Sequence, residues 1–308
     1  MQEETQMIKG LSITPPVVGR ISIGRVVERS GKRLPEKDDQ FTITSQIQTK
    51  EGWILHPYDE GFRKAQGGKI RSIPVTVLFD DPSLNFRAAY TMFDRQSGRP
   101  MCSGDGETCR RVCIDGIKQM PCPTPVNCEM GQGGLCKPYG RLNVVIGDED
   151  PTATFVYRTT GYNSIRTLTA RLHQFQALSG DKLSCLPLEL RLRGKSTTMS
   201  RGTPIYYVDL TLRTGMTMAE ALQAAVATHD KRQESGFDQS ALDAAARTGL
   251  ANGEFEETED EAGTVVEEFY PDDEVHGESK EKLKPSLTDK LGSKLSQQIC
   301  TGTQEDAP

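Results

Sequence analysis

Apolar and polar residues alternate or cluster over short stretches through the first hundred residues, a pattern typical of β-strands. Residues 17–27 and 41–47 are rich in β-branched side chains and are separated by a Ser-Gly-Lys turn signal. Residues 70–79 and 86–93 have the same character, with Asp-Asp-Pro-Ser between them as the turn. We therefore expect two strand pairs in this region.

The pattern disappears over residues 94–138, which are rich in Cys, Gly and Pro. A loop of that length without regular structure needs something else to hold it. Strand-like patterns return at 141–146 and 154–159, and again at 186–192 and 205–212. The last two strands are expected to form a hairpin, joined by the polar and basic loop 194–202.

Helical spacing is found in three places, each near a residue that favours a helix start. The first helix, capped by Asn163 or Ser164, would bury the apolar positions Ile165, Leu168, Leu172, Phe175 and Leu178. The second would begin at the capping box Thr217 to Glu220 and run to about Arg232. Asp238 would cap a shorter third helix, which Gly249 would end.

Charge divides the chain unequally, although the net charge is only −6. Residues 1–213 contain 29 Lys and Arg against 22 Asp and Glu, whereas residues 214–308 contain 8 against 21. Residues 254–274 include 11 acids and no Lys or Arg. A segment with so much repulsion and so little apolar surface is expected to be disordered.

These patterns predict an α+β protein with a β-rich core. The core domain would span residues 7–213 and contain a Cys-rich, zinc-binding insertion at 94–138. A helical pair at 214–251 and an acidic, disordered tail at 252–308 would follow. No run of about 18 apolar residues is present, and the acidic first residues do not resemble a signal peptide, so we expect a cytoplasmic protein that does not enter a membrane.

Six of the eight cysteines lie between residues 102 and 136, whereas Cys185 and Cys300 stand apart. In a reducing compartment, clustered thiols within a loop that lacks its own core favour a structural zinc ion over disulfides. We predict one Zn²⁺, held by Cys109, Cys122, Cys128 and Cys136, with Cys113 as the alternative to Cys109. The competing interpretation is that these are metal-free core or surface thiols.

The other cysteines are not assigned to the metal. Cys102, which is nearest the preceding strand, is left out of the ligand set. Cys185 is expected in the core and Cys300 as a free thiol in the tail.

Sequence motifs for catalysis are missing. The Gly-rich run 131–134 does not continue into a phosphate-binding loop, and the four histidines are scattered. No His-Glu-x-x-His or Gly-x-Ser-x-Gly sequence occurs. A zinc ion saturated by four thiolates also has no open position for a reactive water. The sequence therefore predicts a non-enzymatic protein with no catalytic residues.

Basic residues are in excess between 158 and 213, where the sequence contains nine Lys and Arg but only three Asp and Glu. Strand alternation places Arg191 and Arg193 on one face, opposite Leu190 and Leu192. With Tyr206 and Tyr207 on the returning strand, such a face could follow phosphates and stack on bases. An ordinary charged sheet face explains it equally well. The candidate nucleic-acid-binding residues are Arg158, Arg166, Arg171, Arg191, Arg193, Lys195 and Arg201.

Several short motifs resemble those of one family. They include Gly-Arg-Ile-Ser-Ile-Gly at 19–24, Cys-Lys-Pro-Tyr-Gly-Arg-Leu at 136–142, Thr-Thr-Gly-Tyr-Asn-Ser-Ile at 159–165 and Leu-Pro-Leu-Glu-Leu-Arg-Leu at 186–192. Together with residues 7–11, 14–16 and 106–111, they resemble a family on proteobacterial mobile elements whose members are labelled "hydrolase or metal-binding protein". The order of features is similar, more distantly, to actinophage recombination directionality factors. The resemblance covers about residues 7–213.

The resemblance implies a non-enzymatic accessory protein of DNA recombination. Its partner would be an integrase, another recombinase or a further recombination protein, and directionality factors bind a large serine integrase to promote excision. DNA is a second expected partner. The alternatives are a zinc-containing nucleic-acid-binding protein for replication or repair and, ranked last, a metal-dependent hydrolase.

Overall fold

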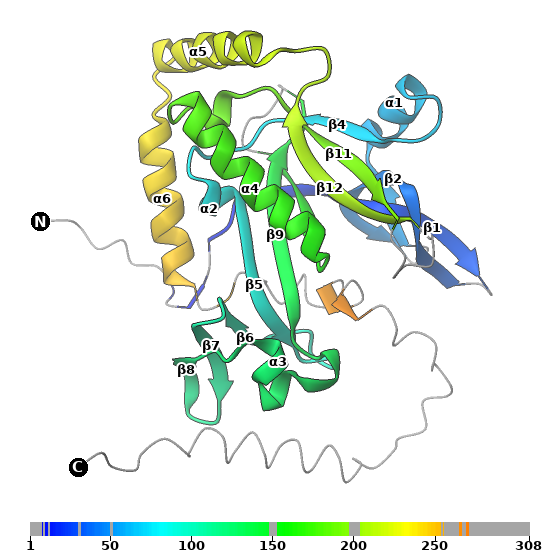
Figure 1. Ribbon diagram of the computed structural model, residues 1–308, viewed down its shortest axis with the longest axis vertical. Coiled ribbons are helices and arrows are strands. Elements are labelled where there is room, and N and C mark those ends of the chain that lie inside the picture. Colours follow the sequence, from blue (N-terminus) through cyan, green and yellow to red (C-terminus); the bar gives the residue numbers. More distant parts are fainter. Residues whose placement is uncertain are drawn as a thin grey trace, which may run out of the picture. The chain divides into compact units, whose positions relative to one another are not determined.

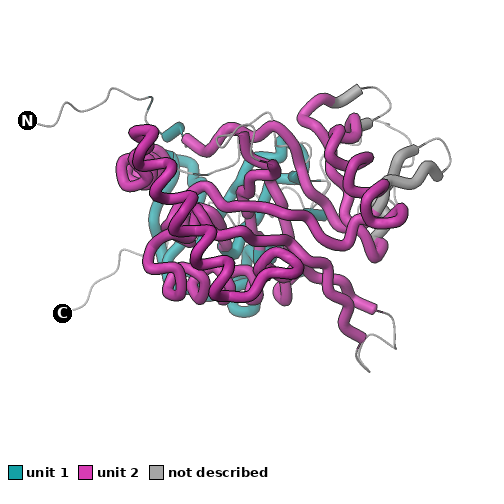
Figure 2. The backbone as a smooth tube through the Cα atoms, turned by 90° about the horizontal axis from the view of Figure 1, so that it is seen from above, with its two compact units in different colours: residues 1–12, 89–138, 252–308 teal, residues 13–88, 139–251 magenta. Residues whose placement is uncertain are grey.

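The computed structural model divides the chain into two compact units, which are coloured separately in Figure 2. Unit 1 comprises residues 1–12, 89–138 and 252–308, and unit 2 comprises residues 13–88 and 139–251. The residues that the structure describes are 8, 10–11, 13–29, 32–49, 52–147, 153–196, 204–253, 255, 265–266 and 269–270.

Unit 2 contains two β-sheets (Figure 1). The larger one has the strand order β3 (Gly52–Leu55), β2 (Lys32–Thr49), β1 (Val17–Arg29), β10 (Thr154–Thr159) and β9 (Lys137–Val145). β1 and β10 pair in parallel, and the other pairs among these five strands are antiparallel. The long hairpin of β1 and β2 and the pairing of β9 with β10 confirm the strands predicted in these regions.

The smaller sheet has the order β12 (Ile205–Leu212), β11 (Leu188–Lys195) and β4 (Ser72–Val75), all antiparallel. The predicted β11–β12 hairpin is confirmed. The expected pairing of 70–79 with 86–93 is wrong, because β4 pairs with β11.

The reason lies in the turn between them, which forms the short helix α2 (Pro82–Asn85). The buried Asn85 amide oxygen accepts hydrogen bonds from the backbone N–H groups of Leu78 and Phe79 at 3.1 and 3.0 Å. These bonds satisfy backbone donors that would otherwise need a strand partner, so the following strand, β5 (Phe86–Phe93), is free to leave in another direction.

The remaining helices of unit 2 are α1 (Pro57–Ala65), α4 (Tyr162–Ser179), α5 (Met218–Glu234) and α6 (Gln239–Asn252), with a 3₁₀ turn at Leu183–Cys185. α4 lies beside β12 (Figure 1), and it buries Leu168, Leu172 and Phe175 as predicted. α1 was not predicted. It begins at Pro57, directly after His56, whose side chain accepts the Tyr58 backbone N–H.

The two C-terminal helices differ in how well they were predicted. α5 has the predicted capping box, since Thr217 and Glu220 each bond the backbone N–H of the other. α6 continues past Gly249, which was expected to end it. Gly249 packs against Ile13, where a Cβ would lie 2.9 Å from the Ile13 Cβ. Its lack of a side chain is therefore needed for this contact and not for a helix stop.

One apolar core joins the two sheets of unit 2 to its helices. Ile21 and Phe41 from the larger sheet, Leu190 and Leu210 from the smaller one, and residues of α4 and α5 belong to the same buried cluster. Ala221 and Ala225 of α5 are fully packed within it. The segment 214–251, expected as a separate helical pair, thus belongs to unit 2.

Unit 1 contains regular structure where the sequence suggested a loop. β6 (Pro100–Gly104), β7 (Thr108–Cys113) and β8 (Gly116–Pro121) follow β5 as neighbours in an antiparallel series. The short helix α3 (Thr124–Asn127) and a 3₁₀ segment, Glu129–Gly134, complete it. The expectation of a structureless 94–138 is therefore wrong.

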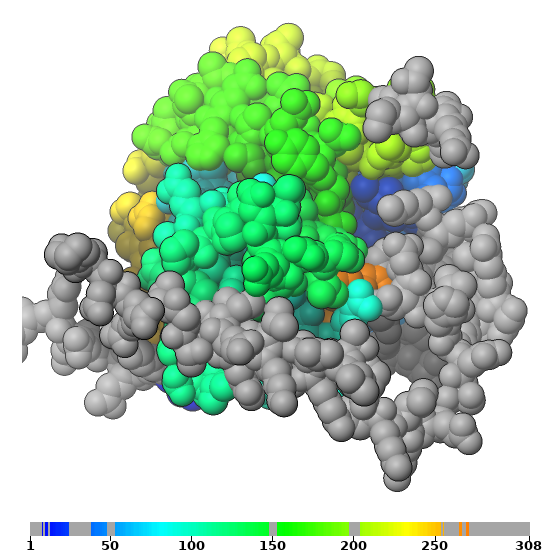
Figure 3. Space-filling view, turned by 60° about the horizontal axis from the view of Figure 1, so that its bottom comes forward, coloured from blue at the N-terminus to red at the C-terminus, as the bar shows by residue number. Residues whose placement is uncertain are grey.

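Part of the acidic C-terminal segment also belongs to unit 1. Val265, Phe269 and Tyr270 are buried, and Figure 3 shows the orange atoms of residues 265–266 and 269–270 beside blue-green atoms of the cysteine-rich segment. The Tyr270 hydroxyl donates to the Leu135 carbonyl at 2.7 Å. Lys137 Nζ donates to the Phe269 carbonyl at 3.1 Å. Residues 252–253, 255 and 266 are also described, whereas the rest of the tail, including Cys300, lies outside the described part.

In the described part of the chain, no helix combines the length and the apolar character that a membrane span requires.

Candidate functional site

Two groups of predicted site residues can be located: the basic residues of unit 2 and the cysteines of unit 1. The basic residues centre on the β11–β12 hairpin. Its register places Glu189 opposite Thr211, Arg191 opposite Asp209 and Arg193 opposite Tyr207. These side chains share one face of the strand pair, and the leucines that alternate with them belong to the core.

Two of the predicted arginines share one buried carboxylate. Arg171 Nε of α4 lies 3.3 Å from Asp209 Oδ1, and Arg193 Nε lies 3.3 Å from Asp209 Oδ2. The Asp209 side chain is 7% exposed, whereas both arginine side chains are 42% exposed. The negative charge on Asp209 therefore offsets part of the positive charge that the sequence assigned to this face.

A third arginine is held by a second buried acid. Arg191 Nε donates to Glu189 Oε1 at 2.9 Å, and the Thr214 backbone N–H donates to Glu189 Oε2 at 2.9 Å. Burial acts to raise the pKa of Glu189, but the hydrogen bonds from Thr214 and Arg191 outweigh it and hold that pKa below its ordinary value. Glu189 is therefore an anion within the fold at neutral pH.

The other predicted basic residues do not join this group. Lys195 is exposed at the end of β11, and Arg166 is exposed on α4. Arg158 is half-buried on β10, opposite Arg141 of β9. Arg201 lies outside the described residues. The structure thus places Arg171, Arg191 and Arg193 in ion pairs with the acids of this face, which Arg158, Arg166 and Lys195 do not join.

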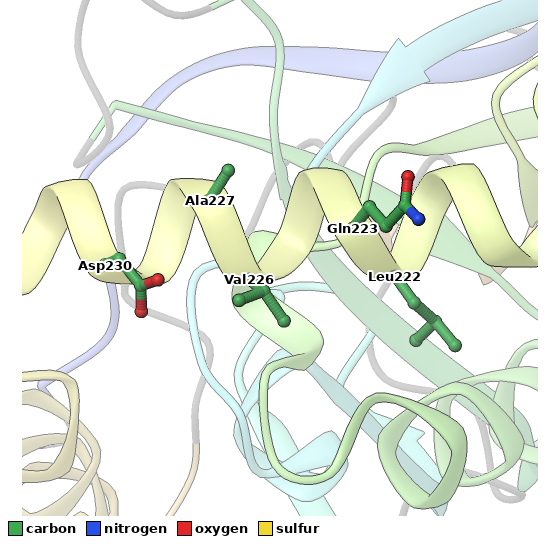
Figure 4. Close-up of a pocket in the computed structure, with 5 residues that line it drawn as sticks. All are labelled: Leu222, Gln223, Val226, Ala227 and Asp230. Carbon is green, nitrogen blue, oxygen red and sulfur yellow. The ribbon is translucent and has the colours of Figure 1, made fainter.

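A shallow hollow on unit 2 is lined by residues of α5 alone (Figure 4). Its lining consists of Leu222, Gln223, Val226, Ala227 and Asp230. Because one helix supplies all five residues, no polar groups converge there from different elements. The hollow lacks the concave, convergent character of a small-molecule site.

The described cysteines of unit 1 come from two strands, β6 and β7, and from the segment that follows β8. In the register, Cys102 of β6 lies opposite Arg111 of β7, and Gly104 lies opposite Cys109. Because alternate residues share a face, Cys102, Cys109 and Arg111 project from the same side of the strands. Cys122 follows β8, and its backbone N–H donates to the Glu107 carbonyl at 2.8 Å.

Two further cysteines flank the 3₁₀ segment. A Cβ placed on Gly131 would lie 3.0 Å from the Cys136 Cβ and 3.4 Å from the Cys128 Cβ. Both cysteines therefore lie close to Gly131, and any side chain at this position would crowd them.

Four of the cysteines belong to one packed cluster of unit 1. Cys102 and Cys109 are buried at its centre, and Cys122 and Cys136 pack against them. Cys128 is not part of this cluster. The remaining members are apolar: Met92, Met101, Met120, Met130 and Leu135. The structure thus adds Cys102, which the sequence analysis left out, to three of the four predicted ligands.

A buried cation lies among these sulfur atoms. Arg111 is 6% exposed; its Nη2 lies 3.7 Å from Cys128 Sγ, and it also hydrogen-bonds the Cys102 side chain. Nothing in the sequence alone pointed to Arg111, because its position depends on the register of β6 and β7.

The thiols of this cluster hold their protons strongly. Burial raises the pKa of Cys109 to about 12, and the neighbouring Cys102 adds to the effect. Burial likewise raises the pKa of Cys136 to about 12, with contributions from Cys102, Cys128 and Cys122. Without a bound cation, these two groups are neutral thiols at physiological pH.

Among the cysteines that the structure describes, all but one are free. Cys102, Cys109, Cys122, Cys128, Cys136 and Cys185 are free, whereas Cys113, the alternative ligand, is disulfide-bonded. Cys185 is buried in the core of unit 2, as expected. As placed, no three Cys, His, Asp or Glu side chains among the described residues converge on a point at coordinating distance.

Comparison with known proteins identifies the family. A family model described as Gp3-like, recombination directionality factor-like, matches residues 18–213. The chain belongs to this family. The match confirms the resemblance to directionality factors, and it runs from β1 to the residue after β12. No curated protein and no solved structure matches the chain.

The family description concerns the direction of recombination. It supports the expectation of an accessory protein that acts with a recombinase on a mobile element. Both the β11–β12 face and the cysteine-rich segment lie within the matched residues, whereas α5 and α6 lie outside them.

Proposed function

We propose that this protein is a recombination directionality factor that binds the large serine integrase of a mobile genetic element and promotes excision. The observation that carries the proposal is the family match over residues 18–213. The integrase would cut and rejoin the DNA, and this protein would decide which pair of attachment sites recombines.

Such a factor needs no catalytic group of its own. A protein that binds one integrase–DNA assembly more tightly than another shifts the equilibrium between them by its difference in affinity. A tenfold change in that equilibrium corresponds to about 1.4 kcal/mol at 25 °C. A modest contact surface is therefore sufficient, provided that it is available in only one of the two assemblies.

We propose the loop end of the β11–β12 hairpin, where β11 ends and β12 begins, as this contact surface. Ile205 is 50% exposed and lies opposite Lys195 in the register, next to the pair of Gly194 and Tyr206. Together with Arg193 and Tyr207, these residues have the composition of protein–protein hot spots, which are enriched in Arg and Tyr.

The ion pairs on this face favour a protein partner over DNA. Nucleic-acid binding depends on cations that replace counterions on phosphates. Arg171 and Arg193 already share Asp209, and Arg191 already pairs with Glu189. Their contribution to phosphate binding is correspondingly reduced, whereas paired arginines remain well suited to a protein interface.

A recombination assay with purified components tests the function. The integrase encoded on the same element is supplied with its attL and attR sites, or with attP and attB, with and without this protein. We expect the protein to permit recombination of attL with attR and to reduce that of attP with attB. If an active integrase gives the same products with and without saturating amounts of the protein, the proposal is wrong.

A pair of matched surface variants tests the contact surface. Ile205→Asp should weaken integrase binding at least tenfold, because it places a charge in an apolar contact. Val126→Asp makes the same kind of change at a residue of unit 1 that is 87% exposed, and it should leave binding unchanged. Equal binding by both variants would reject this surface while leaving the function to be decided by the recombination assay.

A further inference from the structure

The buried guanidinium of Arg111 requires a negative charge near it. Arginine stays protonated in proteins, and a buried cation is costly unless an anion accompanies it. The described hydrogen-bond partners of the Arg111 side chain are the sulfur atoms of Cys102 and Cys128. Neutral thiols do not supply that charge.

The acids of the same segment are engaged elsewhere. Asp94 accepts hydrogen bonds from Ser97, Asp105 accepts the backbone N–H groups of Glu107 and Thr108, and Asp115 pairs with Lys118. Each of these contacts lies in an exposed turn, and the other two acids of the segment, Glu107 and Glu129, are exposed. Among the described residues near Arg111, the cysteines are therefore the groups able to become the missing anions.

We propose that Cys102, Cys109, Cys122 and Cys136 together bind one structural Zn²⁺. These are the four cysteines that share one packed cluster. Four thiolates around Zn²⁺ leave a net charge of −2, and Arg111 lies where it would offset part of that charge.

The choice of zinc follows from the ligand set. A site made of four thiolates favours zinc or an iron–sulfur centre over hard cations such as Mg²⁺ or Ca²⁺. A closed four-coordinate zinc site has no open position for a reactive water, so the site would stabilise the fold and would not catalyse a reaction. The thiol groups do not converge on one point as placed, so binding the ion requires them to move toward one another.

This ligand set differs from the one that spacing predicts by exchanging Cys128 for Cys102. Cys128 lies outside the packed cluster. Arg111 hydrogen-bonds both Cys128 and Cys102, so the packing of the cluster, and not this bond, is the ground on which we assign Cys128 to the surroundings of the metal. Cys102 instead lies at the centre, directly across the strand pair from Arg111.

Zinc content of the full-length protein tests the site. We expect about one zinc per chain after purification without a chelator. Cys102→Ser, Cys109→Ser, Cys122→Ser and Cys136→Ser should each lose at least nine-tenths of it, whereas Cys128→Ser and the core control Cys185→Ser should retain it. Retention in Cys102→Ser with loss in Cys128→Ser would overturn this ligand set. Wild-type protein without zinc would overturn the site, and protein-bound iron would overturn the choice of metal.

Cobalt substitution keeps the proposal testable if a cysteine variant does not fold. Co²⁺ exchanged into the wild-type protein should give the visible absorption of a tetrahedral ion and intense thiolate-to-cobalt charge transfer. Spectra of a six-coordinate oxygen site would contradict the proposal.

Arg111→Met should lower zinc affinity by about 10–100-fold, the usual effect of losing a group that supports metal ligands, and Arg111→Lys should restore part of it. An unchanged affinity in Arg111→Met would reject the role of the guanidinium.

Discussion

Glu189 shows how a single buried acid organises the hairpin face. It is 2% exposed and accepts hydrogen bonds from the Thr214 backbone, the Thr214 hydroxyl and Arg191. These bonds tie the start of β11 to the chain that follows β12. A buried carboxylate is stable only with such partners, so the ionised form of Glu189 contributes to folding.

Replacing Glu189 with Gln should therefore destabilise unit 2 by about 1–3 kcal/mol, the cost of leaving buried partners unsatisfied. The amide NH₂ would face the Thr214 backbone N–H, which is also a donor. Urea unfolding of the two proteins at pH 7 measures the difference. Glu60→Gln, at an exposed position of α1, is the matched control and should change stability by less than about 0.5 kcal/mol.

The difference should also depend on pH in a definite direction. The pKa of Glu189 is lower in the folded protein than its ordinary value of 4.5. Its stabilising contribution is therefore complete above pH 4.5 and is lost as pH falls through the folded-state pKa. The difference in the free energy of unfolding between the wild type and Glu189→Gln should become smaller below pH 4.5. A difference that becomes larger there would contradict this assignment.

At the scale of single residues, the sequence predicts the strand face on which a side chain lies better than it predicts the residue with which that side chain pairs. Alternation correctly puts Arg191 and Arg193 on the face opposite Leu190 and Leu192. It does not reveal that Asp209 pairs with Arg193, because that pairing depends on the register of two strands and joins residues that are 16 positions apart in the sequence. The same limit applies to Cys102, whose place beside Arg111 follows from strand pairing and not from spacing.

At the scale of elements, α5 depends on its first turn. The Thr217 hydroxyl accepts the Glu220 backbone N–H at 3.3 Å, and the Glu220 carboxylate accepts the Thr217 backbone N–H at 2.7 Å. The helix contributes only two small residues, Ala221 and Ala225, to the fully buried core. Local capping should therefore matter more here than in α4, which buries larger side chains.

Thr217→Ala should lower the free energy of unfolding by about 0.5–2 kcal/mol, the typical cost of losing an N-cap hydroxyl. Thr228→Ala is the same substitution at an exposed position of the same helix. It should be neutral or slightly stabilising, because Ala has the higher helix propensity. Both values come from denaturant titrations followed by circular dichroism. Equal effects of the two substitutions would show that the cap contributes nothing.

The elements that were predicted and those that were missed differ in which residues form the buried face. β11 and β12 alternate core leucines and valine with polar residues, and β1 and β10 are rich in β-branched and aromatic side chains, so all four could be recognised from the sequence. In β7 the buried alternate positions are Cys109 and Arg111, which hydropathy does not count as a core. β8 leaves no residue fully buried. Unit 1 therefore looks irregular in sequence although it is built of strands.

At the scale of the whole molecule, unit 1 is assembled from three separate stretches of chain. Phe269 packs edge-on against Phe93, with ring centroids 4.9 Å apart. Arg95 lies over the Tyr270 ring at 4.7 Å, and the Tyr270 hydroxyl bonds the Leu135 carbonyl. The acidic character of the surrounding sequence concealed these aromatic contacts, which supply apolar burial to a unit that otherwise has little.

Phe269→Ala should therefore destabilise unit 1 by about 3–5 kcal/mol, the usual cost of removing a buried aromatic ring. Phe269 is 1% exposed, and its loss would leave a cavity beside Phe93. Because unit 2 has its own core, we expect limited proteolysis to cut the variant first within residues 94–138, while the segment 139–251 persists. Val126→Ala, at an exposed site of unit 1, should keep the wild-type cleavage pattern. If Phe269→Ala is cleaved no faster than Val126→Ala, the residues around position 269 do not support unit 1, and its stability must come from the strands and the cysteine cluster alone.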